Sequence, residues 1–171
     1  MRRKMYLLTG LGLLSMALSA ENICVSTPNT SLVINASEGQ ELKFIYYGEK
    51  LSEDDLKNIS SSGLPQFPAY PVYGMNCPGE AALAVKHADG NMSLQMEVEK
   101  TASRTENNAV ITTITMKDKV YPFYIDVCYK AYQDADVIET WTEISHGEKK
   151  PVALNQFASA YLPIRRGNVW L

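Results

Sequence analysis

Four acidic side chains lie close together in the sequence at Asp134, Asp136, Glu139 and Glu143. Two carboxylates can catalyse a hydrolysis together when they converge across a cleft at a set distance. We expect Asp134 and Asp136 to occupy a turn, and Glu139 and Glu143 to share one face of a strand with Trp141. Because one strand supplies only one wall of a cleft, the pattern favours a solvated edge or an interface. No catalytic residue is predicted.

Metal-ligating side chains are few and badly spaced. The three cysteines, Cys24, Cys77 and Cys128, lack C-x-x-C spacing, and the only histidines are His87 and His146. We therefore predict no metal site, and the sequence has no phosphate-cradling glycine loop that would indicate a cofactor. An odd number of cysteines leaves at least one thiol unpaired. Two interpretations stay open: three buried thiols that act as small hydrophobes, or one disulfide and a spare thiol.

A proline-rich segment, "GLPQFPAYPVYGMNCPGEA" at 63–81, is the most suggestive candidate for binding. A loop of this length in a compact domain often has a binding role. Aromatic rings can stack on the apolar faces of sugars, so Tyr70 and Tyr73 are the predicted substrate-binding residues, with Asn76 as a polar contact. Pro68 and Pro71 bracket Tyr70 and limit its conformations. The alternative is that both rings pack on the protein and hold the loop in place.

The elements that would position these residues are strands. Apolar and polar residues alternate in "NMSLQMEV" (91–98) and "YPFYIDVCY" (121–129), which is the pattern of half-buried strands. Further candidates are 31–34, 42–47, 82–85, 109–116, 136–144 and 152–162. The predicted inward faces comprise Met92, Leu94, Met96 and Val98 in the first segment, and Tyr121, Phe123, Ile125, Val127 and Tyr129 in the second.

One short helix is predicted near 52–59. Ser52 can cap its N-terminus, and the acidic run 53–55 suits the positive end of the helix dipole better than a metal site. Leu51 and Leu56 have the spacing of a hydrophobic staple. About ten short strands with one minor helix predict an all-β fold, an antiparallel β-sandwich of a supersandwich-like kind.

The N-terminus has the pattern of a secretory signal. Arg2, Arg3 and Lys4 precede an apolar stretch that is shorter than a membrane span, and small residues follow at Ser19 and Ala20. We predict a cleaved signal peptide at 1–20 and a secreted or periplasmic protein, with an uncleaved N-terminal anchor as the alternative. No later segment is apolar and long enough to span a membrane.

The charge of the predicted mature chain disfavours nucleic acid as a partner. Loss of Arg2, Arg3 and Lys4 reduces the 16 basic residues to 13, against 19 acidic residues, so the net charge becomes −6. A nucleic-acid-binding domain requires a basic face. The remaining residues suit a single domain at 21–171, large enough to bury about two-thirds of its surface.

Several strings, in order, resemble the N-terminal domain of glycoside hydrolase family 36, whose members are mainly α-galactosidases. They are "STPNTSLVIN" (26–35), "KFIYYGEKL" (43–51), "YPVYG" (70–74), "ALAVKHADG" (82–90), "DVIETWTEISHGEKKPVALNQFASAYLPI" (136–164) and "VWL" (169–171). The resemblance covers nearly the whole mature chain, and residues 136–162 are its most specific part.

The resemblance implies a β-sandwich followed by a (β/α)₈ barrel with two catalytic aspartates that act by a retaining mechanism. No barrel pattern occurs here, so none of the catalytic positions is carried over, and the chain alone is predicted to be inactive. The sandwich would be incomplete at its C-terminal end. It would support the barrel and contribute oligomer contacts in an enzyme that hydrolyses terminal α-galactosides, and the barrel would decide between galactose and N-acetylgalactosamine. The alternative is a free-standing carbohydrate-binding or adhesive β-sandwich.

Overall fold

The computed structural model describes residues 22–59, 66–75 and 79–163. The predicted signal peptide, Asn76, Cys77 and the residues after 163 therefore lie outside the described part. The elements are β1 (Asn22–Ser26), β2 (Thr30–Asn35), β3 (Lys43–Glu49), α1 (Glu53–Asn58), β4 (Phe67–Pro68), β5 (Leu83–Lys86), β6 (Met96–Glu106), β7 (Ala109–Asp118), β8 (Phe123–Tyr132), β9 (Ile138–His146) and β10 (Ala153–Phe157).

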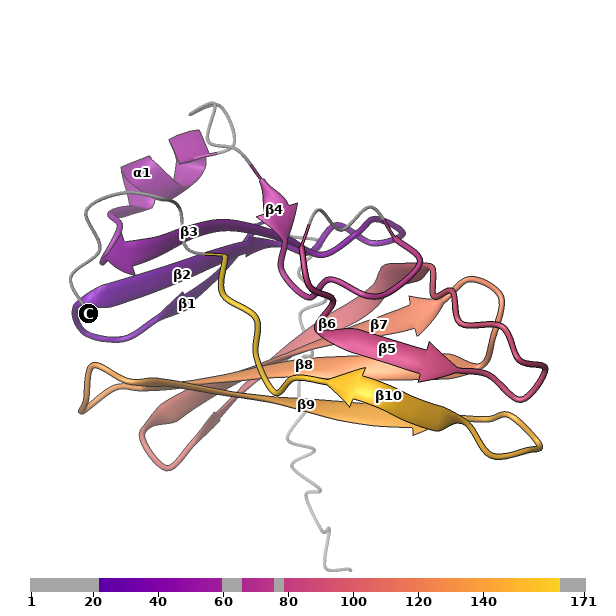
Figure 1. Ribbon diagram of the computed structural model, residues 1–171. Coiled ribbons are helices and arrows are strands. Elements are labelled where there is room, and N and C mark those ends of the chain that lie inside the picture. The colour runs from indigo at the N-terminus through magenta and orange to yellow at the C-terminus, as the bar shows by residue number, and fades with distance from the viewer. Residues whose placement is uncertain (1–21, 60–65, 76–78, 164–171) are drawn as a thin grey trace, which may run out of the picture.

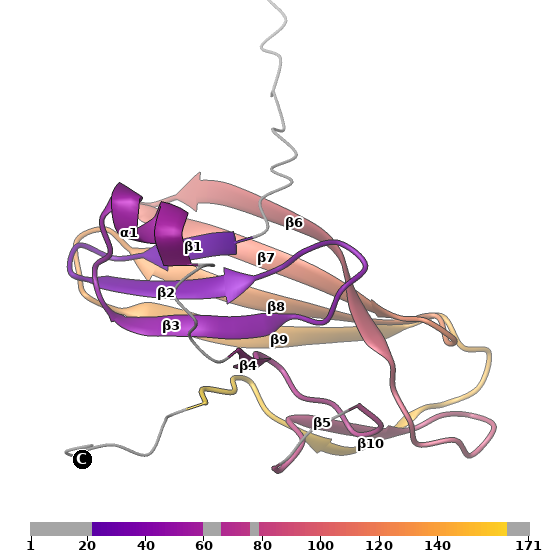
Figure 2. The same ribbon diagram turned by 90° about the horizontal axis from the view of Figure 1, so that it is seen from above.

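Two four-stranded sheets form the layers of the sandwich, as predicted. One has the order β1-β2-β3-β4 and the other β6-β7-β8-β9, and neighbouring strands run antiparallel in both. Figure 1 shows the two layers one above the other. Strands β5 and β10 form a separate two-stranded sheet at the side of the sandwich where β4 and β9 lie (Figure 2).

The core lies between the two four-stranded sheets. Leu32 and Ile34 of β2 face Ile114 and Met116 of β7 and the inward side chains of β8 within one buried cluster. The predicted alternation of β8 is confirmed, because Phe123, Ile125, Val127 and Tyr129 are all buried. Burial of apolar surface stabilises a fold by about 25 cal/mol per Å². The sheets are therefore held together mainly by this layer of side chains.

The helix covers the outer face of the first sheet (Figures 1 and 2). Ile59, at its C-terminal end, packs with Val33 and Ile45 in a second buried cluster that also contacts Leu51 and Leu56. The predicted cap is confirmed: the Ser52 hydroxyl accepts a hydrogen bond from the Asp55 N–H, and the Asp55 carboxylate accepts one from the Ser52 N–H. This coverage explains why four consecutive residues of β2 are buried on both faces.

The prediction for Met92 is wrong, because its side chain is 38% exposed and β6 begins only at Met96. The Leu94 N–H donates to the Tyr73 carbonyl, and the Ser93 N–H donates to the Asn91 side chain. Residues 91–95 therefore form their hydrogen bonds with the 66–75 loop and with the Asn91 side chain, and they lie outside any strand ladder. Leu94 itself is buried as expected.

Other strands also differ from the sequence prediction. Strand β1 was not predicted, and β6 extends to Glu106 through polar, exposed residues that give no periodic signal. A two-residue turn closes the β6–β7 hairpin, with positive φ angles at Asn107 and Asn108, as expected for a primed turn. Strand β10 is shorter than the predicted 152–162 because its ladder with β5 ends at Phe157.

Gly74 is the point where the 66–75 loop approaches the segment before β6. A Cβ atom built there would lie 2.7 Å from the Ser93 Cα atom, and the φ angle of Gly74 is +101°. Gly90 has a similar φ angle of +95°, but its Cβ would meet nothing within 4 Å. A substitution at Gly90 would thus cause backbone strain alone, whereas the same substitution at Gly74 would cause strain and a steric clash.

We predict that Gly74→Ala destabilises the protein more than Gly90→Ala. Both variants incur the strain of a positive φ angle, about 1–3 kcal/mol, and only Gly74→Ala adds overpacking against backbone, about 1–3 kcal/mol more. Urea denaturation of the two variants beside the unchanged chain measures the difference. Equal losses of unfolding free energy would contradict the close contact between the loop and Ser93.

Candidate functional site

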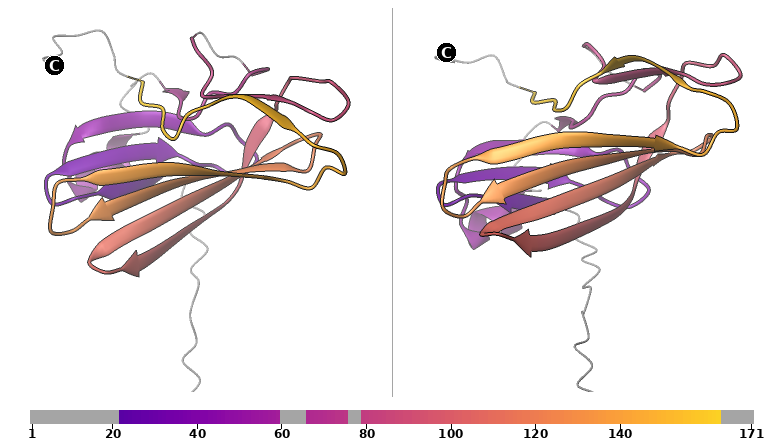
Figure 3. Two further views of the ribbon diagram at one scale, coloured as in Figure 1. Left: turned by 60° about the horizontal axis from the view of Figure 1, so that its bottom comes forward. Right: turned by 90° about the horizontal axis from the view of Figure 1, so that it is seen from below.

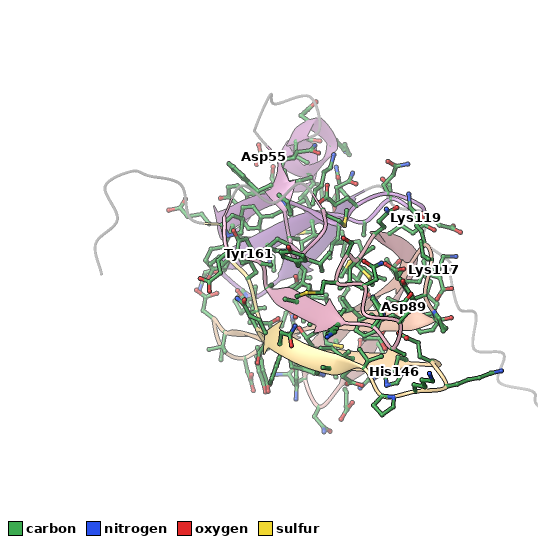
Figure 4. All side chains as sticks on the ribbon, turned by 45° about the vertical axis from the view of Figure 1, so that its right-hand side comes forward. Asp55, Asp89, Lys117, Lys119, His146 and Tyr161 are labelled. Carbon is green, nitrogen blue, oxygen red and sulfur yellow. The ribbon has the colours of Figure 1, made fainter. Side chains whose placement is uncertain are left out.

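A cavity of about 180 Å³ opens between the two four-stranded sheets beside the 66–75 loop. Its walls come from β2, β3, β8 and β9, from the loop, and from the segment that follows β10. Its aromatic lining consists of Phe44, Tyr47, Tyr70, Tyr129 and Tyr161, of which Tyr161 is labelled in Figure 4. An apolar cavity of roughly this size can hold a benzene-sized ring. The cavity could therefore accommodate a small apolar ring or an apolar side chain.

Tyr70 is part of the wall of this cavity. Its side chain is only 5% exposed, and its hydroxyl donates a hydrogen bond of 2.7 Å to the Ala158 carbonyl. Burial raises the pKa of Tyr70, and hydrogen bonds with Thr142 and Ala158 partly offset that rise. The ring and the hydroxyl of Tyr70 both serve the packing of the loop against the segment after β10, which favours the packing alternative for this residue.

Tyr73 is placed differently from Tyr70. It is 51% exposed, and its backbone N–H donates to the Leu83 carbonyl, which fastens the loop to β5. Its ring is accessible to a ligand that approaches from outside. Asn76, the predicted polar contact, lies outside the described residues. A sugar-binding role for Tyr70, Tyr73 and Asn76 thus stays a prediction, and the exposure of Tyr73 makes it the member best placed to test.

Two polar residues of the cavity were not identified as candidates from the sequence. Tyr129 of β8 and Thr140 of β9 are direct cross-strand partners and line the cavity together. The Thr140 hydroxyl is buried without a hydrogen-bond partner, and burial strongly raises the pKa of Tyr129. The alternation of 121–129 predicted that Tyr129 faces inward, but it could not indicate that the core is hollow at this point.

The four acidic residues considered for catalysis do not form a converging pair. Asp134 and Asp136 lie in the bend between β8 and β9, as predicted, and the Asp136 carboxylate accepts a hydrogen bond from the Thr27 hydroxyl. That bond is the main cause that lowers the pKa of Asp136. Glu139 and Glu143 each accept a hydrogen bond from a neighbouring aromatic side chain.

Glu139 and Glu143 lie on the outer face of the second sheet with Trp141, as predicted. Glu139 accepts a bond of 2.8 Å from the Tyr132 hydroxyl, and Glu143 accepts one of 2.9 Å from the Trp141 indole N–H. None of the described helices covers this outer face (Figure 3). The face therefore offers a half-buried tryptophan between exposed carboxylates, without the two walls of a catalytic cleft.

The cysteines and histidines form no metal-binding group in the part of the chain that the structure describes. Cys24 and Cys128 are both free thiols, and Cys77 lies outside the described residues. Burial is the main cause that raises the pKa of the Cys128 thiol. These two cysteines thus behave as small, partly or fully buried side chains. Among the described residues, no helix has the length and apolarity that a membrane crossing requires.

Solved structures of α-galactosidases share this fold. The galactosidase domain of the α-galactosidase–sucrose kinase AgaSK matches with a TM-score of 0.70 at 19% identity, over 82% of this chain and 24% of that chain. The A355E D548N variant of the family 36 α-galactosidase AgaA from Geobacillus stearothermophilus, solved with raffinose, matches with a TM-score of 0.69 at 15% identity, over 81% and 24%. The α-galactosidase from Lactobacillus brevis gives a TM-score of 0.67 at 15% identity, over 81% and 23%.

The chain thus spans about a quarter of the length of these solved enzymes, and the low identities establish a likeness of fold. No curated protein sequence matched the chain. The model of the glycosyl hydrolase family 36 N-terminal domain matches residues 40–171, which include the loop, the cavity lining except Leu32, and both four-stranded sheets from β3 onwards. This chain belongs to the family of glycosyl hydrolase family 36 N-terminal domains.

Proposed function

We propose that this chain is the non-catalytic N-terminal β-sandwich of a larger α-galactosidase. Membership of the glycosyl hydrolase family 36 N-terminal domains, over residues 40–171, is the observation that carries the proposal. The full enzyme would hydrolyse terminal α-galactosides, and raffinose, present in one solved relative, represents that substrate class. The sandwich would support a (β/α)₈ barrel, and two aspartates of that barrel would act by the retaining double displacement.

The exposed side of β10 supports the idea that further polypeptide covers this domain. Leu154 lies opposite Val85 in the ladder, and Phe157 lies opposite Leu83. Directly paired residues point to the same face of a sheet, yet Val85 and Leu83 are fully buried whereas Phe157 is 66% exposed. Among the described residues, the apolar face of this small sheet thus continues past the core with Leu154 and Phe157 exposed. A following segment of a longer chain would bury it.

Secretion and assembly belong to the same proposal. The basic residues Arg2, Arg3 and Lys4 and the apolar stretch after them support export to the periplasm or the medium. N-terminal sequencing of the exported protein tests this, with cleavage expected after Ser19 or Ala20. The full-length enzyme would also form oligomers to which this domain contributes contacts.

We predict that the purified chain does not release nitrophenol from nitrophenyl α-galactoside, because the four carboxylates at 134–143 do not form a converging pair. A longer polypeptide, encoded by reading in frame past the Leu171 codon, should hydrolyse the same compound. The control is an extract from an expression host that lacks its own galactosidases. Turnover by the chain alone would contradict the non-catalytic role, and a stop codon directly after Leu171 would contradict the larger enzyme.

The two tyrosines of the loop should behave differently when each is changed to alanine in the longer enzyme. Tyr70→Ala should lose about 3–5 kcal/mol of unfolding free energy, as for truncation of a buried aromatic side chain, with kinetics unchanged below the melt. Tyr73→Ala should raise KM for a galactoside with Tm nearly unchanged, because an exposed ring contributes little to stability.

Tyr124→Ala, on the outer face of β8, provides a matched control for the loss of a partly exposed tyrosine. It should change neither KM nor Tm appreciably. If Tyr73→Ala leaves both KM and kcat/KM at the control values, the loop does not reach a sugar site and the binding prediction fails.

A further inference from the structure

A buried histidine and a glutamate join two turns at the side of the molecule that carries β5 and β10. His87 follows β5, and its side chain is fully buried. Glu148 lies in the connection between β9 and β10, and its Oε1 atom is 2.7 Å from the Nδ1 atom of His87. The second carboxylate oxygen accepts a bond of 3.1 Å from the Ala88 N–H. Glu148 thus fastens the chain that leads into β10 to the end of β5.

Aromatic rings enclose the imidazole. The Tyr121 ring stacks on it with centroids 3.7 Å apart and planes 8° from parallel, and the Phe123 ring meets it edge-on at 5.8 Å. The Nε2 atom of His87 is buried without a hydrogen-bond partner. The Nδ1 atom is thus engaged by Glu148, whereas the Nε2 atom is shut off from water. No metal-binding group occurs among the described residues.

The titratable groups around the imidazole come from three connections. They are Glu148 and His146 from the end of β9 and the segment after it, Asp89 from the turn after β5, and Tyr121 from the segment between β7 and β8. The Tyr121 hydroxyl donates a bond of 2.7 Å to Asp89. Figure 4 labels Asp89 and His146 at this side of the molecule.

Acid has a specific consequence in this geometry. While Glu148 is ionised, the Nδ1–H group donates to a carboxylate whether or not the ring is charged. Once Glu148 is protonated, the Nδ1–H group faces a neutral acid, and the buried ring keeps an Nε2 atom without a partner. A hydrogen bond to a charged group is about twice as strong as one between neutral groups, so the loss of this charge weakens the hold of Glu148 on the ring.

We propose that the His87–Glu148 pair is an acid-sensitive clamp on β10. At neutral pH it holds residues 147–157 against β5, and protonation of Glu148 releases this segment while the two four-stranded sheets stay folded. The segment is suited to local opening, because β10 pairs only with β5 among the described strands and four of its five residues are exposed.

The direction of the pH dependence follows from Glu148. The hydrogen bond from His87 is the main cause that holds the pKa of Glu148 below its usual range. The stabilisation from this carboxylate is therefore complete above the usual glutamate pKa, and it disappears as the pH falls through the lowered value. Opening of β10 is therefore expected to increase as the pH falls from the usual glutamate pKa to the lowered value.

Hydrogen exchange of the full chain, followed by mass spectrometry across the acid range, tests the proposal when rates are corrected for the intrinsic effect of pH. As the pH falls from the usual glutamate pKa to the lowered value, protection of residues 147–157 should fall by up to about tenfold per pH unit, the slope expected for one proton. Protection of β7 and β8 should not change over the same interval. Loss of protection in β10, β7 and β8 together would overturn the proposal, because it would indicate global unfolding.

Two variants separate the roles of the partners. Glu148→Gln retains an acceptor for Nδ1–H but has no carboxylate to protonate, so protection of β10 should lose its acid-dependent step and should already be low at neutral pH. His87→Gln removes the imidazole Nδ1 donor to Glu148, so the acid-dependent step should vanish as well. Glu143→Gln, an exposed carboxylate on β9 that bonds to Trp141, is the matched control and should leave the acid-dependent step unchanged. An acid-dependent step that is the same in Glu148→Gln as in the unchanged chain would also overturn the proposal.

Discussion

The burial of two inward faces against each other is the constraint on which the rest of this structure depends. Ile34 from one sheet and Ile114 and Phe123 from the other belong to a single buried cluster. Because the side chains of a strand alternate between two faces, this cluster fixes the register of each strand. It thereby fixes which residues face outward, including Trp141. The cavity lies at one side of the same interface, where the aromatic rings leave space between the sheets.

The sequence predicted the features that repeat along the chain. The alternation at 121–129 identified the inward face of β8, and the cap and staple around Ser52 identified the helix, because both patterns depend on residues only a few positions apart. Met92 was assigned wrongly because the same alternation continues into a segment that the Tyr73 carbonyl holds outside the strand ladder. The polar half of β6 gave no signal, since its residues are exposed on both faces.

The contacts that define the candidate sites join residues far apart in the chain, and no local pattern could predict them. The Tyr70 hydroxyl bonds to the carbonyl of Ala158, 88 residues away, which accounts for a packing role that the sequence left open beside sugar binding. His87 and Glu148 are separated by 61 residues and showed no motif. The resemblance to family 36 supplied what composition and periodicity could not, namely the family to which the domain belongs and hence the proposal of a larger enzyme.

We proposed that further polypeptide covers the β10 side of the sandwich, and hydroxyl-radical footprinting of Phe157 tests this proposal most directly. Phe157 is exposed although its ladder partner Leu83 is fully buried. We expect Phe157 to be oxidised readily in the 171-residue chain and several-fold more slowly in the longer enzyme, about as expected when a large apolar side chain is removed from water. Tyr124, on the outer face of β8, should react equally in both. Equal oxidation of Phe157 in the two proteins would contradict the account.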